Sequence, residues 1–520
     1  MKAESRSLLY GTVVMTVANF IVRVSGFVYR ILVSRLIGPQ GMGLIQLVYP
    51  LFFTAIALTS SGLPVAVSRL VAEKNARGDV SGVHRTVSTA LRLSAAVSLT
   101  VSVILLLAIN PVSVHIIKDI RARGAMIALL PSLIIISLVV VLKGYFYGIK
   151  SVRPPALAEI LEQFVRMGVS LALLYWAAPR FSLAVTAALV MLGTVMGDLA
   201  SLAYLHYTYG IFGPRPGKDT AMPGKSRVLR DLVAIALPII GTRLVSSVLQ
   251  SANSVIIPQR LVAGGMPVEE AIGLFGILTG MVMPLLFMPF VVTNALQVNM
   301  IPNLSENVAT DNLRGLQDKT DKALMITTFT AFPSVAVLIS LGRPLGDLLY
   351  GQPMVGELIV PVSLGLVAYA LQHTSSGILN GLGKQNRAAV HFIIGSLIQL
   401  ICSYFLIAMP GIGIYGYIAG FFASSIVVCL LNLSTALPAI RLPFNTVDWL
   451  LKPGFSAFLM TSVTSAAYKF CLAKGLPSYL CLTASFVPGI ASYILSIFAL
   501  KGFPPTLLAR FRRAGSQRGI

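Results

Sequence analysis

Arginine residues recur inside long apolar stretches of this chain, where a charged side chain is costly. Arg23 and Arg30 lie in the first such stretch, and Arg243 lies in the seventh. An ionisable group in the interior of a membrane usually faces a water-filled cavity or a partner of opposite charge. The planar guanidinium group binds phosphate and carboxylate through parallel hydrogen bonds. These residues therefore predict a cavity that binds an anionic headgroup, whose apolar tail could stay in the lipid.

Other polar residues accompany the arginines at helical spacing. Arg23 and Arg30 are seven residues apart and so lie on nearly the same helix face, in a stretch that also carries Asn19. Arg243 is followed by Ser246, Ser247, Gln250 and Asn253, a polar row of helical period. Arg30 lies near the end of its stretch and could instead extend towards the membrane surface. The predicted substrate-binding residues are Asn19, Arg23, Arg30, Arg166, Arg243 and Gln250.

Three acids lie in the same kind of apolar stretch: Glu159, Glu162 and Asp198. Glu162 and Arg166 are spaced so that they can form an ion pair within one helix. Asp198 could pair with a basic residue on another helix. We interpret these acids as supporting charges, and they leave the arginines in modest excess within the apolar stretches.

The elements that must position these residues are membrane-spanning helices. The chain has 520 residues, of which 56% are hydrophobic and 11% charged. A soluble protein has about 25% charged residues, and a disordered chain has low hydrophobicity. At roughly 20 residues per span, the apolar segments predict an all-α polytopic membrane protein with about 14 transmembrane helices.

The positive charge follows the predicted loops. The chain has 40 Lys and Arg against 18 Asp and Glu, a net charge of +22. Most of the basic residues fall in alternate loops and in the tail, as the positive-inside rule requires of cytoplasmic segments. The loop with Lys118, Arg121 and Arg123 goes against the rule. We expect a bacterial cytoplasmic membrane protein with both termini in the cytoplasm and no nucleic-acid partner.

An internal repeat divides the predicted spans. Landmarks return after about 233–234 residues, such as Gly144 and Gly148 as Gly377 and Gly381. The offset covers an even number of spans, which predicts two six-helix lobes in parallel repeat plus two C-terminal helices. The predicted domains are an N-lobe (1–229), a C-lobe (230–445), the last two spans (446–500) and a basic cytoplasmic tail (501–520).

Signals for enzymes and cofactors are weak. The five His are scattered, and the four Cys show no spacing typical of a metal site or a disulfide framework. We therefore predict no catalytic residues, no metal and no cofactor.

Several motifs resemble the multidrug/oligosaccharidyl-lipid/polysaccharide (MOP) exporter superfamily, specifically its polysaccharide-biosynthesis type. They are Arg23-Val24-Ser25-Gly26-Phe27-Val28-Tyr29-Arg30, Ser34-Arg35-Leu36-Ile37-Gly38, Ser68-Arg69-Leu70-Val71-Ala72-Glu73, Lys143-Gly144-Tyr145-Phe146-Tyr147-Gly148 and Glu162-Gln163-Phe164-Val165-Arg166. The resemblance covers nearly the whole chain. It implies a flippase that moves an undecaprenyl-pyrophosphate-linked sugar, such as a peptidoglycan precursor, to the outer leaflet, in the context of sporulation and cortex synthesis.

In the related lipid II flippases, arginines in spans 1, 2 and 8 are essential. Arg23 matches the first of them, whereas Tyr29 stands at the position of the second and Arg30 follows it. The segments 60–62 and 278–280 carry no arginine where spans 2 and 8 of those flippases do. Arg243 could supply a substitute charge.

Three alternative functions remain open at this point. A flippase for another lipid-linked polysaccharide would use the same residues. A cation antiporter of the MATE type would depend on Glu159, Glu162 and Asp198 rather than on the arginines. A non-transporting scaffold would bind cell-wall synthases through its basic inner loops. For the favoured function, a flippase for a peptidoglycan precursor, the expected partners are a lipid-linked anionic glycan substrate and membrane lipids.

Overall fold

The structure is a computed structural model, and it describes residues 2–177, 180–214 and 225–502. All regular elements in these ranges are helices, which confirms the predicted all-α class. The predicted tail, 501–520, lies almost entirely outside the described residues.

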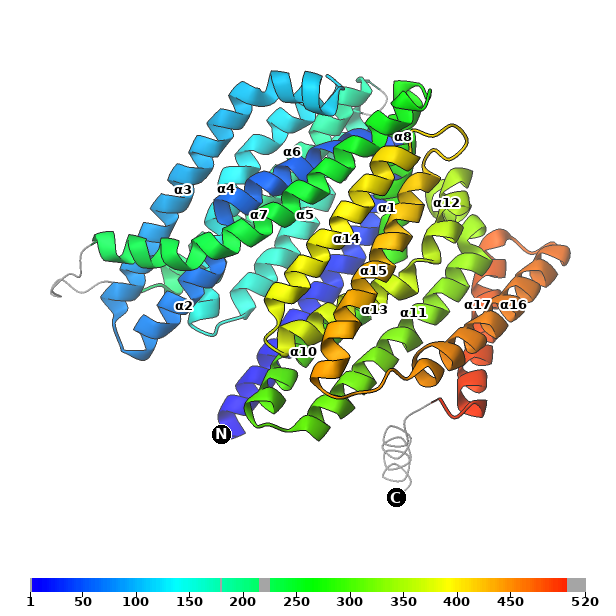
Figure 1. The fold of residues 1–520 in the computed structure, drawn as a ribbon. Coiled ribbons are helices and arrows are strands. Elements are labelled where there is room, and N and C mark those ends of the chain that lie inside the picture. The colour runs from blue at the N-terminus through cyan, green and yellow to red at the C-terminus, as the bar shows by residue number, and fades with distance from the viewer. Residues whose placement is uncertain (1, 178–179, 215–224, 503–520) are drawn as a thin grey trace. The chain divides into compact units, whose positions relative to one another are not determined.

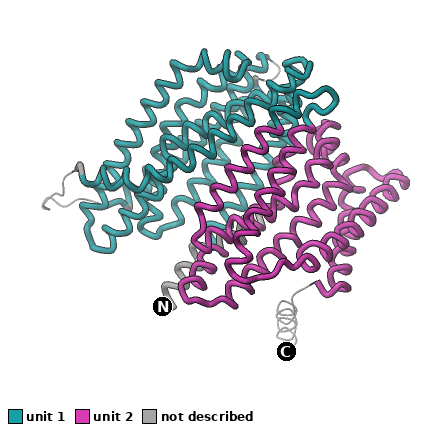
Figure 2. Tube along the Cα trace, in the orientation of Figure 1, with its two compact units in different colours: residues 1–281, 403–414 teal, residues 282–402, 415–520 magenta. Residues whose placement is uncertain are grey.

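Contacts between helices divide the chain into two compact units, which Figure 2 shows in different colours: residues 1–281 with 403–414, and residues 282–402 with 415–520. The predicted lobe boundaries after residues 229 and 445 follow the sequence repeat and stay a prediction.

The first unit begins with the longest helix of the described chain and contains three further helices of 30 residues or more. Its elements, most of them labelled in Figure 1, are α1 (Lys2–Ser60), α2 (Leu63–Ala76), α3 (Val80–Pro111), the π-helix η1 (Val112–Ile117), α4 (Ala122–Gly148), α5 (Arg153–Ala177), α6 (Leu183–Phe212), α7 (Lys225–Ala263), α8 (Val268–Gly276) and nearly all of the π-helix η2 (Ile277–Val282).

The second unit holds the remaining helices, except for the last four residues of α14, which belong to the first unit. They are α9 (Met283–Phe287), α10 (Phe290–Ala309), α11 (Leu313–Tyr350), α12 (Pro353–Ser363), α13 (Leu366–Gly381), α14 (Gln385–Leu406), α15 (Tyr415–Ala439), the π-helix η3 (Val447–Leu451), α16 (Lys452–Ala473) and α17 (Ser478–Ala499). The last two helices pack on this unit, because Met460 of α16 and Ile497 of α17 form one buried cluster with Ala336 of α11.

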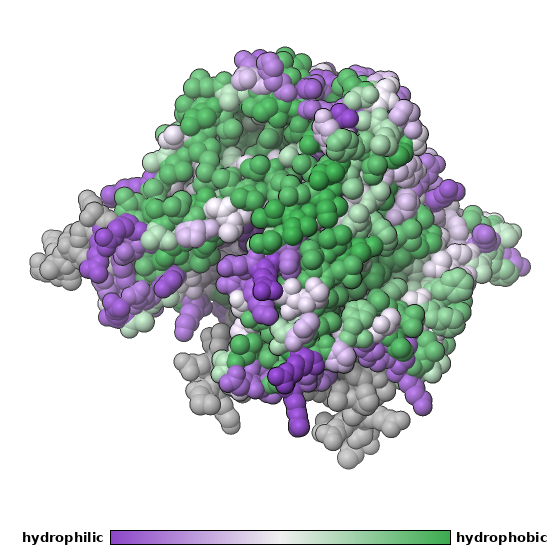
Figure 3. Space-filling view, viewed as in Figure 1, coloured by the Kyte–Doolittle hydropathy of each residue, from purple (hydrophilic) through white to green (hydrophobic). Residues whose placement is uncertain are grey.

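The exposed surface of the helices is strongly apolar. Figure 3 shows large hydrophobic areas over the helices and hydrophilic residues gathered mainly near helix ends. Side chains such as Leu107 and Val487 are 77% and 69% exposed. Apolar surface of this extent is rare on soluble monomers and is typical of helices that face lipid.

Ten helical stretches within the described ranges are long and apolar enough to cross a membrane, or up to 11 if the bent pair α12 and α13 forms one span. The predicted count of about 14 is not confirmed. Merging of neighbouring segments contributes to the difference. The apolar segments 8–33 and 44–71 of the sequence each have the length of one predicted span, but they belong to one helical stretch of 64 residues, Val13–Ala76.

The internal repeat is visible in the caps of two helices. Asp79 caps α3, since its Oδ1 accepts a hydrogen bond of 2.7 Å from the backbone N–H of Gly82. Asn312 caps α11, and its Oδ1 accepts a bond of 3.0 Å from the backbone N–H of Gly315. Asp79 and Asn312 are separated by the predicted offset, and so are Gly82 and Gly315. The two repeats of the sequence therefore use the same capping arrangement.

The repeated glycines also have a shared packing role. A Cβ atom at Gly148 of α4 would lie 2.7 Å from the Cβ of Val71 on α2, and one at Gly381 of α13 would lie 2.8 Å from the Cβ of Leu304 on α10. Each glycine thus lets two helices of its own unit approach closely. The equivalent contacts explain why these positions return in the sequence.

Candidate functional site

Helix α1 changes direction at Gly38, where two predicted spans meet. Gly38 has φ 68° and ψ −176°, a conformation outside the helical region that favours glycine. Pro39 follows, and the residue before a proline is disfavoured in the helical conformation. The break separates an N-terminal half of α1, which carries the predicted arginines, from a C-terminal half that lines a pocket.

The predicted residues on the N-terminal half of α1 are accessible. Asn19 and Arg23 are exposed, and Arg30 is partly buried. Asn19, Arg23 and Arg30 follow at intervals of four and seven residues, which places them near one face of the helix.

Helix α7 carries a row of polar residues on one face. Arg243, Ser247, Gln250 and Ser254 follow one another at intervals of four, three and four residues. Arg243 and Gln250 are exposed, and the two serines are partly buried. Two of the predicted site residues therefore belong to a continuous polar row.

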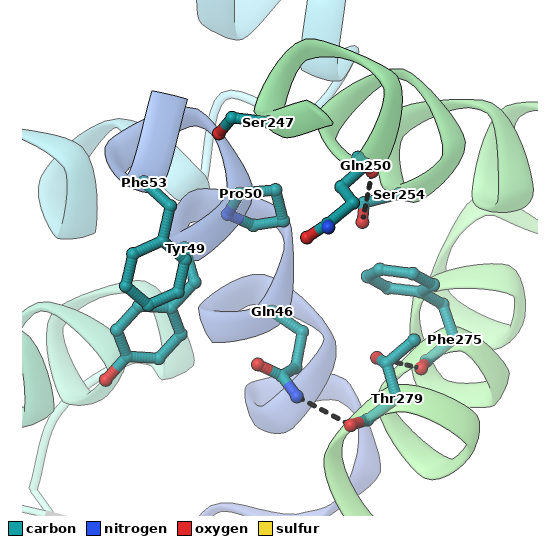
Figure 4. A pocket seen from close by; sticks show the side chains of 9 residues that line it. All are labelled: Gln46, Tyr49, Pro50, Phe53, Ser247, Gln250, Ser254, Phe275 and Thr279. Carbon is teal, nitrogen blue, oxygen red and sulfur yellow. Dashed lines mark hydrogen bonds between the residues drawn. The ribbon is translucent and has the colours of Figure 1, made fainter. Parts of the chain in front are cut away.

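A pocket of about 210 Å³ opens beside this row within the first unit. Residues of four elements line it: Gln46, Tyr49, Pro50 and Phe53 of α1, Ser247, Gln250 and Ser254 of α7, Phe275 of α8, and Thr279 of η2. Figure 4 shows the Gln250 carboxamide pointing into the space between Pro50, Gln46 and Phe275. None of these lining residues carries a charge.

A hydrogen bond joins two walls of the pocket. Gln46 donates from Nε2 to the carbonyl oxygen of Thr279, with 2.7 Å between the two atoms (Figure 4). Thr279 lies in the π-helix η2, and wide helical turns of this kind occur often at functional sites. Thr279 in turn donates from its hydroxyl to the carbonyl oxygen of Phe275 at 2.6 Å.

Hydroxyl groups hold α7 against α1 next to the pocket. Thr54 of α1 lies 3.0 Å from the Ser247 hydroxyl and 2.7 Å from the Ser251 hydroxyl, Oγ to Oγ. Ser251 donates to the carbonyl oxygen of Pro50 at 2.7 Å. Bonds of this kind replace the apolar driving force that is missing between helices in lipid.

Two glycines set the distance between α1 and α8. A Cβ atom at Gly276 would overlap the carbonyl oxygen of Pro39 and the backbone nitrogen of Gly43. A Cβ atom at Gly43 would overlap the carbonyl oxygen of Ile272. The backbones touch because both positions lack a side chain, and this contact fixes one end of the pocket.

The predicted acids meet one of the predicted arginines in a separate cluster of the first unit. Arg166 and Glu162 form an ion pair on α5, with 2.5 Å between Nη2 and Oε1. The same Nη2 lies 3.4 Å from Oδ1 of Asp198 on α6. Asp198 is buried and accepts a hydrogen bond from the hydroxyl of Ser132 on α4. Two carboxylates therefore share one guanidinium group.

The third acid has its own partner. Glu159 pairs with Lys143 of α4, with 3.0 Å between Oε1 and Nζ. Close packing of α5 and α6 supports the neighbouring cluster, since a Cβ atom at Gly197 would lie 2.9 Å from the Cβ of Arg166. The acids thus engage basic residues of the bundle.

The sequence patterns pointed to Gln250 but not to Gln46, Tyr49, Phe53 or Thr279. A signal was present, since Gln46, Tyr49 and Phe53 follow at helical spacing in an otherwise apolar segment. Thr279 carried no such signal, because it contributes through its backbone.

Comparisons with known proteins agree with this architecture. A family model described as polysaccharide biosynthesis protein matches residues 8–308, and a second, MatE, matches residues 261–405. Stage V sporulation protein B of Bacillus subtilis (strain 168) is 26% identical over 500 residues, which cover 95% of this chain and 96% of that protein. Lipid II flippase MurJ of the same organism is 23% identical over 435 residues, 78% of each chain.

A solved structure shares the fold. The structure titled "Lipid II flippase MurJ, inward closed conformation" superposes with a TM-score of 0.71 at 14% sequence identity, covering 93% of this chain and 98% of that one. The names of these relatives are not those of enzymes, in agreement with the predicted absence of catalytic activity.

Proposed function

The chain belongs to the polysaccharide biosynthesis protein family, within the MOP superfamily, and from this premise we propose that it is a flippase for a lipid-linked anionic saccharide. It would move its substrate from the inner to the outer leaflet of the bacterial cytoplasmic membrane. The flippase named among its relatives supports this activity.

One observation carries the proposal: the polar row of α7 combines an exposed arginine with a neutral polar pocket. Arg243 offers a guanidinium group for phosphate, and Gln250 borders a cavity that has no charged lining residue. A lipid-linked saccharide has these two parts, a charged phosphate linkage and a neutral polyol.

The substrate that fits best is an undecaprenyl-pyrophosphate-linked peptidoglycan precursor. The name of the sporulation relative supports a role in spore cortex synthesis, and the name of the lipid II flippase supports this class of lipid. Another lipid-linked polysaccharide would satisfy the same chemistry, and a direct transport measurement separates the two.

In the proposed mechanism, Arg23 and Arg243 bind the pyrophosphate, assisted by Asn19 and Arg30. Arg166 has a different role, because Glu162 and Asp198 already compensate its charge. It holds α5 to α6 instead of binding substrate. Transporters built from parallel repeats move substrate by alternating access, and we assign that mechanism to this chain.

The experiment is a leaflet-accessibility assay for lipid II in cells in which this protein is the sole candidate flippase. Wild type should expose lipid II at the surface, and Arg23→Ala and Arg243→Ala should each lower that exposure at least tenfold. Arg92→Ala, which removes an exposed arginine of α3, is the matched control and should retain transport. Well-expressed wild type that exposes no lipid II would contradict this substrate.

The MatE match favours one other candidate, a cation antiporter. That function needs carboxylates that are available to a cation. Glu162 and Asp198 share Arg166, and Glu159 pairs with Lys143, so these acids are already engaged. Asp198→Asn should abolish a cation antiporter and leave lipid flipping in place.

A further inference from the structure

We propose that the pocket between α1, α7 and α8 binds a neutral saccharide ring of the substrate headgroup. This inference rests on the proposed flippase function and adds to it a second contact, made to the sugar and not to the phosphate. Gln46 and Gln250 supply the hydrogen bonds, and Tyr49 and Phe53 supply aromatic surface.

The lining of the pocket matches the chemistry of a sugar ring. Carboxamides and hydroxyls each offer donors and acceptors, as sugar hydroxyl and acetamido groups do. The face of an aromatic ring is negative and attracts the slightly positive C–H groups of a sugar. Tyr49 and Phe53 stack with 5.8 Å between ring centroids, so they form one extended apolar surface beside the polar groups.

The two glutamines are prepared for a ligand in different ways. Gln46 is held in place by its bond to the carbonyl oxygen of Thr279, which leaves its Oε1 as an acceptor. The Gln250 carboxamide points into the pocket (Figure 4) and has no hydrogen-bond partner among the residues that the structure describes. A ligand that supplies donors and acceptors would satisfy both.

The distance between the charged and the neutral groups suits a phosphate-linked sugar. Arg243 and Gln250 lie on one face of α7, seven residues apart, which corresponds to about 10 Å along the helix axis. In a lipid-linked saccharide the first ring is bonded directly to the phosphate. A pyrophosphate bound at Arg243 therefore brings its sugar within reach of Gln250.

The size of the pocket limits what it can hold. Its volume of about 210 Å³ is below the roughly 300–1,000 Å³ of pockets that enclose drug-sized ligands. One ring fits this space, and a longer chain of sugars would extend out of it. The pocket thus selects the ring nearest the phosphate.

The walls of the pocket are rigid, which favours a specific ligand. The hydroxyls of Thr54, Ser247 and Ser251 join α7 to α1. Gly43 and Gly276 bring α1 into backbone contact with α8. Fixed walls lower the entropic cost of binding because few side chains must be ordered.

The test compares binding of two lipids to the purified full-length protein in nanodiscs: lipid II, and undecaprenyl pyrophosphate, which has no sugar. Gln250→Leu and Phe53→Leu should each weaken binding of lipid II about fivefold to tenfold and leave the sugar-free lipid unchanged, since one or two contacts are lost. Arg243→Ala should weaken binding of both lipids. Gln385→Leu, an exposed glutamine at the start of α14, is the matched control.

The outcomes separate the two proposals. If Gln250→Leu and Phe53→Leu leave lipid II binding unchanged, or weaken both lipids equally, the sugar site is overturned while the flippase function stands. If wild type binds neither lipid, the flippase proposal fails and the sugar site fails with it.

Discussion

Gln46 and Thr279 are joined by a hydrogen bond of 2.7 Å, Nε2 to O, although they lie 233 positions apart in the chain. This separation is the offset of the internal repeat, so the two residues are equivalent positions of the duplicated sequence. Gly43 and Gly276 are related by the same offset, and a Cβ atom at Gly276 would overlap the backbone of Gly43. Gln46 and Thr279 both line the pocket, so the pocket borders a contact between equivalent positions of the sequence repeat.

The backbone contact between α1 and α8 predicts that one methyl group added at Gly276 lowers the stability of the protein. Gly276→Ala should lower the stability of the folded protein by ~1–3 kcal/mol, because its Cβ would overlap the backbone of α1. Gly168→Ala is the control, since open space surrounds that position of α5 and alanine favours helix. Thermal unfolding in detergent measures both. Equal melting temperatures for the two variants would contradict the close approach.

The cluster around Arg166 predicts opposite effects for its members. Arg166→Met leaves Glu162 and Asp198 uncompensated and should cost ~3 kcal/mol or more. Asp198→Asn removes the surplus negative charge and should be neutral or stabilising. Adding Asp198→Asn to Arg166→Met should restore part of the loss. If Asp198→Asn destabilised the protein as much as Arg166→Met does, the idea that two carboxylates share the guanidinium group of Arg166 would be contradicted.

The equivalent helix caps predict equivalent losses. Asp79→Ala and Asn312→Ala should each cost ~1 kcal/mol and increase hydrogen exchange in the first turns of α3 and α11. Asp79→Asn keeps an acceptor and should behave as wild type. Hydrogen exchange that rises in the same way after Asp79→Asn would indicate that charge, and not the cap, stabilises α3.

Cysteine labelling can test the predicted orientation of the chain in the membrane. With four native cysteines replaced, Ile120→Cys should react with a membrane-impermeant maleimide in intact cells, because Ile120 is exposed in a predicted outer loop. Arg77 lies in the polar segment 72–86, which the predicted orientation places in the cytoplasm, so Arg77→Cys should react only after the cells are opened. The reverse pattern would place both termini outside.

The charge of the substrate predicts a dependence on membrane potential. With the cell interior negative, outward movement of an anion is favoured by ~2.3 kcal/mol per charge per 100 mV. Collapsing the potential with an ionophore should therefore slow lipid II flipping by the reconstituted protein. An unchanged rate would exclude the potential as a driving force.

The amino-acid sequence alone determined the helical class, the repeat and the polar row of α7, because each depends on spacing within one segment or between repeated segments. It also pointed to the pair of Glu162 and Arg166, which are neighbours on one helix. The tertiary structure decided that Asp198 and Ser132 join this pair and that Gln46 meets Thr279. The contact of Gln46 with Thr279 depends on the approach of α1 to the segment that contains α8 and η2. The contacts of Asp198 depend on the packing of α4, α5 and α6, and spacing within one segment does not reveal either.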